Sequence, residues 1–257
     1  MINKGEVDEL LVALILVFYR DSGNLDLAPV GKVSRVGFAG KEYGSLPTGY
    51  NDISMLRRLS TPQVKNLAQD IGVTKAASSH KADIYINGRG YSFKSHRSNP
   101  PAIINHTHRF GWSRVCKELH IDINPLDIMV AEYWRLRKSG VIKEDIPNSD
   151  PNSPFAKHQE YFSPLIEYFL FKGTGVKPSV SVAEYVLDVE DPLDVSTWDV
   201  YEPKYIVAQY WDRLVFSIRN KGMPDSFPES NKRNDCISVW SEFWQDKYRG
   251  SIHVRVK

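Results

Sequence analysis

The longest apolar run of the chain lies near its start, at residues 10–19, and reads LLVALILVFY. Acidic residues precede this run, and Arg20 and Asp21 follow it. A bilayer span needs about 20 apolar residues, so the run is too short to cross a membrane. It also lacks the basic lead and the small-residue cleavage site of a signal peptide. The pattern predicts a buried core helix within residues 1–20.

Apolar positions three or four residues apart predict further helices. These lie at 52–71, 113–140, 155–171 and 238–245. The first region divides into two helices, because Ser60 and Thr61 provide a cap and Pro62 suits a first helical turn. We interpret this pair as helices packed on a sheet. A DNA-binding helix–turn–helix is the alternative, but neither helix is rich in base-contacting residues.

Runs of β-prone residues predict strands at 32–38, 84–86, 91–94, 205–208, 213–219 and 251–256. The last two alternate apolar with polar residues, as half-exposed strands do. This mixture of elements indicates an α/β (α+β) fold with a β-rich C-terminal part. The polar, proline-rich segment 148–154 is the best boundary candidate. We expect a core at residues 1–150 and a C-terminal part of the same compact domain at 151–257.

Composition bounds the function without choosing it. The chain has 257 residues with 33 basic and 31 acidic side chains, so its net charge of +2 argues neither for nor against nucleic acid. Two cysteines, Cys116 and Cys236, exclude a disulfide framework and a zinc site of four thiolates. The simplest interpretation is a cytoplasmic protein with free thiols.

The most informative stretch, residues 80–112, begins with a predicted β-hairpin whose turn is Asn87-Gly88-Arg89-Gly90. Enzymes that hydrolyse phosphodiesters with a divalent metal need an acid to hold the metal and a cation beside the attacking water. The hairpin offers Asp83, Ser92 and Lys94 for these roles.

Strand alternation brings these three residues together. Because side chains alternate across a strand, Ser92 and Lys94 share one face. A two-residue loop adds Asp83 to that face, opposite Ser92 if the loop begins at Asn87 and opposite Lys94 if it begins at Gly88. A three-residue loop would separate Asp83 from both. The alternative interpretation is a surface hairpin whose polar residues face water.

Residues 95–109 carry many side chains of the types that contact phosphates and base edges. Between Ser95 and His120 the only acid is Glu118. We predict DNA contacts by Ser95, His96, Arg97, Asn99, Asn105, His106, Thr107, His108 and Arg109. Further candidates are Lys172, Thr174, Arg219 and Lys221. A solvated polar loop is the alternative for residues 95–109.

Several short segments together resemble type II restriction endonucleases of the PD-(D/E)xK nuclease superfamily. They are NKGE (3–6), KADIYINGRGYSFKS (81–95), PPAIINHTHRFGW (100–112), FKGTG (171–175), FSIRNKGMP (216–224) and YRGSIHVRV (248–256). The resemblance implies a mixed central sheet flanked by helices, with the first helix packed against it. It also implies that Asp83 binds the metal, that the Phe93 carbonyl is a second ligand and that Lys94 lies beside the attacking water.

Ser92 departs from the family pattern, which usually has Glu or Asp at this position. A hydroxyl cannot supply the missing negative charge, and some relatives recruit a carboxylate from the first helix. Glu6 is therefore the first choice for the missing ligand and Glu9 the second. Because they are three residues apart, both acids share one side of that helix. The alternative is that they only complement the helix dipole.

The resemblance further implies Mg²⁺ as cofactor, with Mn²⁺ as a substitute, and double-stranded DNA as substrate within a restriction–modification system. It implies a homodimer that cuts a short palindrome, no membrane, no nucleotide cofactor and a prokaryotic or viral origin. Three alternatives remain. They are a structure-specific repair or junction nuclease of the same core, a non-catalytic DNA-binding module, and an enzyme unrelated to DNA that uses Asn105 and His106.

Overall fold

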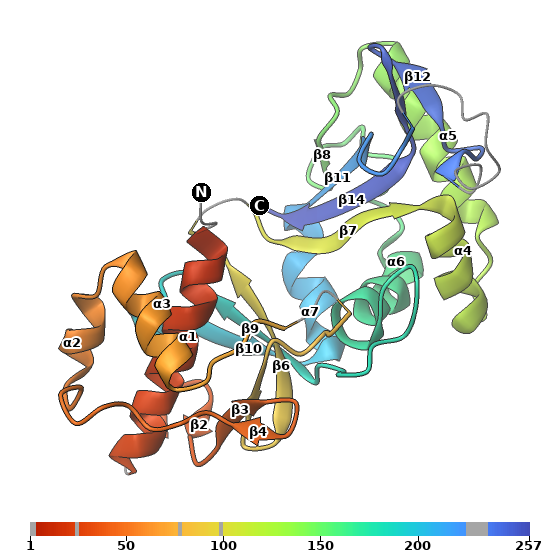
Figure 1. Cartoon of the computed structure of the whole chain (residues 1–257). Coiled ribbons are helices and arrows are strands. Elements are labelled where there is room, and N and C mark those ends of the chain that lie inside the picture. The colour runs from red at the N-terminus through yellow and green to blue at the C-terminus, as the bar shows by residue number, and fades with distance from the viewer. Residues whose placement is uncertain (1–3, 24–25, 77–78, 98–99, 225–235) are drawn as a thin grey trace. The chain divides into compact units, whose positions relative to one another are not determined.

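The computed structural model describes residues 4–23, 26–76, 79–97, 100–224 and 236–257 (Figure 1). Asn99, one of the predicted DNA contacts, lies outside these residues. The chain forms two compact units: residues 1–100 with 179–203, and residues 101–178 with 204–257. This division differs from the boundary expected near residue 150. The segment 148–154 forms turns inside the second unit, and Asn148 is buried with its amide donating to the Trp211 carbonyl oxygen.

The first unit is built on a six-stranded mixed sheet. Its strand order is β10-β9-β6-β5-β3-β4, and only the β6–β9 pair is parallel. The strands are β3 (Val36–Phe38), β4 (Lys41–Glu42), β5 (Ile84–Ile86), β6 (Arg89–Ser95), β9 (Tyr185–Val189) and β10 (Trp198–Tyr201). Two further strands, β1 (Asp26–Leu27) and β2 (Gly31–Lys32), form a small separate sheet. The strand predicted at 32–38 is therefore two short strands.

Helix α1 (Lys4–Ser22) supplies a continuous run of buried apolar residues to the core of this unit. Its residues Leu11–Val17 are buried, and it packs against α2 (Ile53–Arg57), α3 (Thr61–Asp70) and strand β6. This burial confirms the predicted core helix. A helix that is apolar nearly all round must be covered on all sides. Among the described helices, none has the length and apolarity to cross a membrane. Helices on a mixed sheet agree with the expected α+β class.

The hairpin has a two-residue loop that begins at Asn87, the first of the predicted registers. Ile84 pairs with Tyr91 and Ile86 with Arg89, so the loop is Asn87-Gly88. Both loop residues have positive φ, 53° and 85°, as a type I′ turn requires. The Asp83 N–H donates to the Tyr91 carbonyl oxygen at 2.8 Å, which extends the ladder by one residue. Asp83 therefore lies opposite Ser92.

The second unit contains a four-stranded antiparallel sheet with strand order β7-β14-β11-β8. Its elements are β7 (Ala102–His108), α4 (Arg109–Glu118), α5 (Asn124–Lys138), β8 (Ile146–Pro147), α6 (Gln159–Glu167), a π-helical turn (Tyr168–Lys172), α7 (Pro203–Tyr210), β11 (Leu214–Arg219), β12 (Glu242–Trp244), β13 (Lys247–Arg249) and β14 (Ser251–Val256). One face of this sheet packs against a buried aromatic core, in which Phe155 stacks on Phe216 with ring centroids 4.4 Å apart.

Three sequence-based expectations for this unit need correction. Residues 102–108, where no strand was predicted, form strand β7. The strand predicted at 205–208 is part of helix α7, because periodicity cannot distinguish a short apolar run in a helix from one in a strand. The helix predicted at 238–245 is a turn followed by the hairpin β12–β13, whose loop residues Gln245 and Asp246 have positive φ.

Candidate active site

The three hairpin residues meet in the first unit as predicted. The Asp83 carboxylate accepts a hydrogen bond from the Phe93 backbone N–H at 2.7 Å and lies 3.5 Å from the Ser92 hydroxyl. The Lys94 ammonium donates to the Ser92 hydroxyl at 3.0 Å and to the Phe93 carbonyl oxygen at 3.1 Å. An acid, a hydroxyl, a carbonyl and a cation are thus linked along one face of β6.

Burial sets the electrostatics of Asp83. The loss of hydration raises the pKa of its carboxyl, and the Lys94 charge and the Phe93 N–H oppose that rise. Lys81 lowers the pKa of Asp83 as well, and burial together with the Lys94 charge lowers the pKa of Lys81 itself to about 8. Lys81 is therefore a second lysine at this site, and the hairpin pattern did not single it out.

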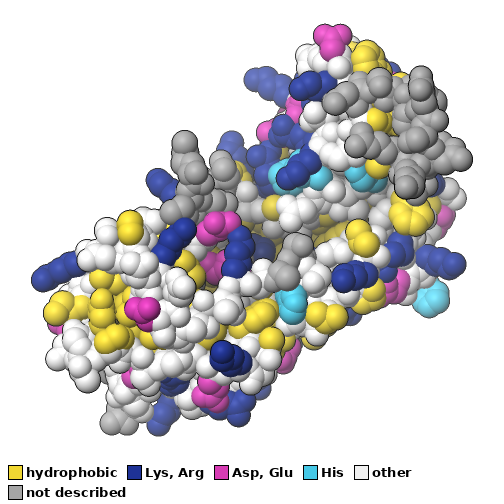
Figure 2. All heavy atoms as spheres, in the orientation of Figure 1, with side chains coloured by type: hydrophobic (Ala, Val, Ile, Leu, Met, Phe, Trp, Pro, Cys, Tyr) yellow, Lys and Arg dark blue, Asp and Glu magenta, His cyan; other side chains and the backbone are white. Residues whose placement is uncertain are grey.

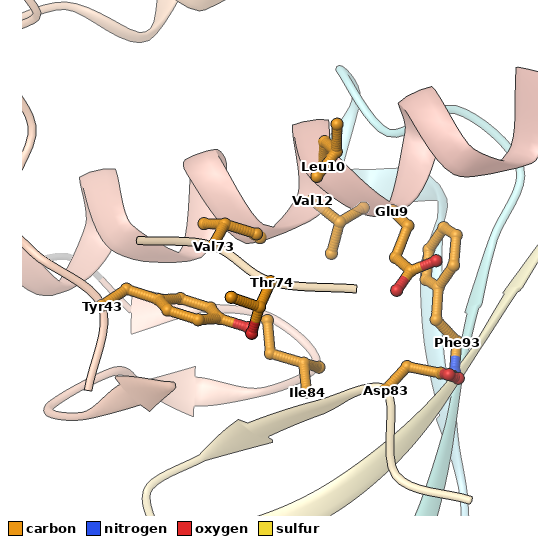
Figure 3. A pocket seen from close by; sticks show the side chains of 10 residues that line it. Glu9, Leu10, Val12, Tyr43, Val73, Thr74, Asp83, Ile84 and Phe93 are labelled. Atoms are coloured by element: carbon orange, nitrogen blue, oxygen red, sulfur yellow. The ribbon is translucent and has the colours of Figure 1, made fainter. Parts of the chain in front are cut away.

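A fourth functional group comes from helix α1. The Glu9 side chain extends from α1 toward Asp83 in the pocket that both residues line (Figure 3). Burial raises the pKa of Glu9 to about 7, and the neighbouring Asp83 charge adds to this rise. Tyr43 lines the same pocket, and burial, Glu9 and Asp83 all raise the pKa of its phenol. Two carboxyl groups therefore share this pocket, and the Lys94 charge acts on both of them.

Glu6 lies elsewhere on the same helix. Its carboxylate forms an ion pair with the exposed Lys75 ammonium, and this hydrogen bond lowers the pKa of Glu6. The pocket that Asp83 lines includes Glu9 but not Glu6. The structure thus favours Glu9 over Glu6 as the helical acid of the site, the reverse of the expected order.

The donor atoms of this pocket suit a hard divalent cation. The Asp83 and Glu9 carboxylates and the Phe93 carbonyl are all oxygen donors, which Mg²⁺ prefers while it keeps several waters. The raised pKa of Glu9 beside a second carboxyl fits a place where a cation would be stabilising. In the described part of the chain, no three His, Cys, Asp or Glu side chains are grouped for metal binding. The fit therefore rests on two carboxylates and one carbonyl.

The residues that follow Lys94 contact acids of the first unit. The Ser95 hydroxyl donates to the Asp8 carboxylate at 2.6 Å, and the Arg97 guanidinium lies 3.7 Å from the same carboxylate, which is only 1% exposed. The His96 imidazole is 2.6 Å from the Asp188 carboxylate on β9. These contacts connect the end of β6 to α1 and β9. Local sequence patterns do not predict these contacts, because the partners are about 90 residues apart.

The remaining DNA-contact candidates lie in the second unit. His106 and His108 on β7 share the sheet face of His253 on β14, and the His106 and His253 rings stack 4.2 Å apart. Lys221, which is exposed, is close enough for its charge to lower the pKa of His106. Histidine side chains beside lysine and arginine are visible on this unit in Figure 2.

Other candidates in this unit already have partners. Arg109 makes two hydrogen bonds to the Asp127 carboxylate, at 2.8 and 2.6 Å. Arg219 pairs with Glu144 and Asp145. The Thr107 hydroxyl donates to the Asn105 carbonyl oxygen at 2.6 Å, and the Thr174 hydroxyl accepts from the backbone of its own loop. Lys172 is exposed at the end of the π-helical turn.

Comparison of the chain with protein-family models, characterised proteins and solved structures gives no match. The argument for a function therefore rests on the residues of this chain and on their geometry.

Proposed function

We propose that the chain is a Mg²⁺-dependent endonuclease that cuts double-stranded DNA at a short palindromic site, in the manner of type II restriction enzymes. The observation that carries the proposal is the contact of Asp83, Ser92 and Lys94 beside a second, half-buried acid, Glu9. An acid pair with an adjacent lysine is the arrangement that metal-assisted phosphodiester hydrolysis needs.

Each residue has a defined part in this proposal. Asp83, Glu9 and the Phe93 carbonyl hold the metal, which supplies an activated water and polarises the scissile phosphate. Lys94 orients that water and stabilises the charge that develops on the phosphoryl oxygens. The hydrogen bond from Lys94 to the Ser92 hydroxyl holds the ammonium in place. Ser92 thus positions the lysine, and Glu9 supplies the charge that the serine cannot.

The proposal assigns DNA contacts to the basic and polar side chains of the second unit, of which His106, His108 and Lys221 lie near one another. It also includes a homodimer, because a two-fold symmetric protein matches a palindromic site. Analytical ultracentrifugation tests this part separately. A dimer at micromolar concentration is expected, and a protein that stays monomeric both alone and with DNA contradicts it.

Digestion of methylation-free phage and plasmid DNA with Mg²⁺, followed by sequencing of the ends, tests the activity. We expect discrete bands whose ends share one short sequence. Cutting confined to junction or flap substrates favours a structure-specific nuclease, and DNA binding without cutting favours a non-catalytic module. A smear or intact DNA contradicts site-specific cleavage.

A further inference from the structure

The second unit contains a pocket of about 320 Å³ that the active-site residues do not line. Its described lining residues come from β7, from the start of α4 and from the loop after the π-helical turn, together with Cys236. Those that matter for a ligand are Asn105, His106, His108, Phe110, Gly111 and Gly175. The volume lies at the small end of the range for organic ligands.

Two glycines pack closely together in the wall of this pocket. A Cβ atom on Gly175 would lie 2.6 Å from the Thr107 methyl group, and one on Gly111 would lie 2.8 Å from the same methyl. The Gly111 and Gly175 backbones are also in close contact, since a Cβ on Gly111 would meet the Gly175 Cα at 3.0 Å. Any larger residue at either position would move the wall of the pocket, so its narrow shape depends on both glycines.

The polar groups that line the pocket can donate and accept hydrogen bonds without carrying charge. The Asn105 side chain is exposed, and its amide has no hydrogen-bond partner among the described residues. The Nδ1 atoms of His106 and His108 are buried and also have no partner there. Burial lowers the pKa of both imidazoles, to about 4 for His106. At neutral pH each ring therefore offers one donor and one acceptor.

Aromatic and basic groups complete the surroundings. The Phe110 ring is 65% exposed although it is large and apolar, so it is available for stacking. His106 also presents an aromatic ring, which stacks on His253 at 4.2 Å. Lys221 acts electrostatically on His106, so a cation lies near the pocket. A flat ligand with polar edges and an attached phosphate matches this combination.

We propose that this pocket binds a nucleobase of a DNA strand, with the base stacked on Phe110, its polar edge bonded to Asn105, and the neutral rings of His106 and His108 beside it. Every base has an apolar face that stacks on an aromatic ring, and amide and imidazole groups can bond to its edge. Lys221 would then contact a neighbouring phosphate. This inference rests on the proposed function for the identity of its ligand, but it does not depend on cleavage.

A short single-stranded oligonucleotide that contains 2-aminopurine tests the inference, because stacking on an aromatic ring quenches its fluorescence. We expect saturable quenching by the full-length protein in EDTA. Phe110→Ala should weaken binding about tenfold, since loss of one stacking contact has an effect of that order. Phe243→Ala is the matched control, because Phe243 is another exposed aromatic of the same unit and lies outside the pocket. It should bind as the wild type does.

Two comparisons separate this inference from the proposed activity. Asp83→Asn should abolish cleavage and leave the quenching unchanged, because Asp83 does not line the pocket. The monophosphate of 2-aminopurine deoxyriboside should bind more weakly than the oligonucleotide; equal affinity would assign the pocket to a free nucleotide and overturn its assignment to DNA. Absence of quenching with the wild type, or equal quenching by Phe110→Ala, overturns the inference even if the protein cleaves DNA.

Discussion

Glu9 on helix α1 and Asp83 before strand β5 line one pocket, and the charge of Asp83 contributes to a pKa of about 7 for Glu9. The two acids are 74 positions apart in the chain and meet because α1 packs against the sheet. Two carboxyl groups held together in a low-dielectric pocket repel one another once both are ionised. A divalent cation bound by both carboxylates would offset that repulsion, so the metal-free protein should be more stable without one of the two charges.

Glu9→Gln should stabilise the metal-free protein and reduce the proposed DNA cleavage. At pH 8 in EDTA most Glu9 side chains of the wild type are charged, because the pKa of this buried group is about 7. Removal of that charge should raise the free energy of unfolding by about 1–2 kcal/mol. Mg²⁺ should raise the melting temperature of the wild type and have little effect on Glu9→Gln. DNA cleavage should fall at least about 100-fold, since changes even outside the ligand shell of a metal can cost that much.

Glu6→Gln is the matched control for this change, because it removes the same group from the same helix. Glu6 is exposed and pairs with Lys75, so its loss should leave cleavage within about threefold of the wild type and change stability by less than about 1 kcal/mol. A large loss of cleavage in Glu6→Gln together with full activity in Glu9→Gln would contradict the assignment of Glu9.

Lys94→Ala should reduce the rate of cleavage strongly and leave the fold intact. The ammonium contacts Ser92 and the Phe93 carbonyl, and its removal takes away the only group assigned to stabilise charge on the phosphate. We expect a loss of about 10²–10³ in rate, comparable to the removal of one oxyanion donor. Single-turnover kinetics measure this effect. Circular dichroism should show unchanged secondary structure, and wild-type cleavage by the variant would exclude Lys94 from the reaction.

The sequence allowed the prediction of the hairpin part of the site because the information there is local. The Asn87-Gly88 turn determines the register, and strand alternation then places Asp83, Ser92 and Lys94 on one face. The choice between Glu6 and Glu9 could not be made in the same way. Both acids lie on one side of α1, and only the packed helix shows which one reaches the pocket and which one pairs with a surface lysine.

Other features depend on partners that are distant in the chain. The contact of Ser95 with Asp8 joins β6 to α1, and no periodicity predicts such a pair. The return of residues 179–203 to the first unit depends on the parallel pairing of β9 with β6. The error at 205–208 has a different cause, because a run of that length has the same apolar content in a strand and in helix α7.

Ser95→Ala should destabilise the protein by about 1–3 kcal/mol, because it leaves one oxygen of the buried Asp8 carboxylate without its donor. Urea denaturation measures this effect. Ser45→Ala is the matched control, since Ser45 also donates to an aspartate, Asp21, but at an exposed position. It should change the free energy of unfolding by less than about 0.5 kcal/mol. Equal effects of the two substitutions would show that the buried Ser95–Asp8 hydrogen bond stabilises the protein no more than the exposed Ser45–Asp21 one.

The stacked histidines of the second unit predict a dependence of stability on pH. Burial lowers the pKa of both His106 and His253 to about 4, and nearby positive charges add to the effect, whereas the unfolded chain titrates near pH 6.5. Between these values the unfolded state binds more protons, so the free energy of unfolding should fall as pH falls from 6.5 toward 4.

Thermal melts at pH 7 and pH 5 measure this dependence. Because both rings are partly exposed, solvent screening reduces the expected loss to about 1 kcal/mol. Between pH 7 and pH 5 the stability of His253→Gln should fall less than that of the wild type. His158→Gln is the control, because it removes an exposed histidine of the same unit, and its stability should fall as much as that of the wild type. A wild-type loss that is the same in His253→Gln would contradict the explanation.

The most direct test of the central claim compares wild type and Asp83→Asn on unmethylated plasmid DNA with Mg²⁺, with EDTA and with Mn²⁺, followed by sequencing of the ends. Asp83→Asn keeps the shape of the side chain and removes the charge that holds the metal. We predict cleavage at one short sequence by the wild type with Mg²⁺ or Mn²⁺, none with EDTA, and none by Asp83→Asn. Equal cleavage by both proteins, or cleavage that persists in EDTA, would contradict a metal-dependent site at Asp83.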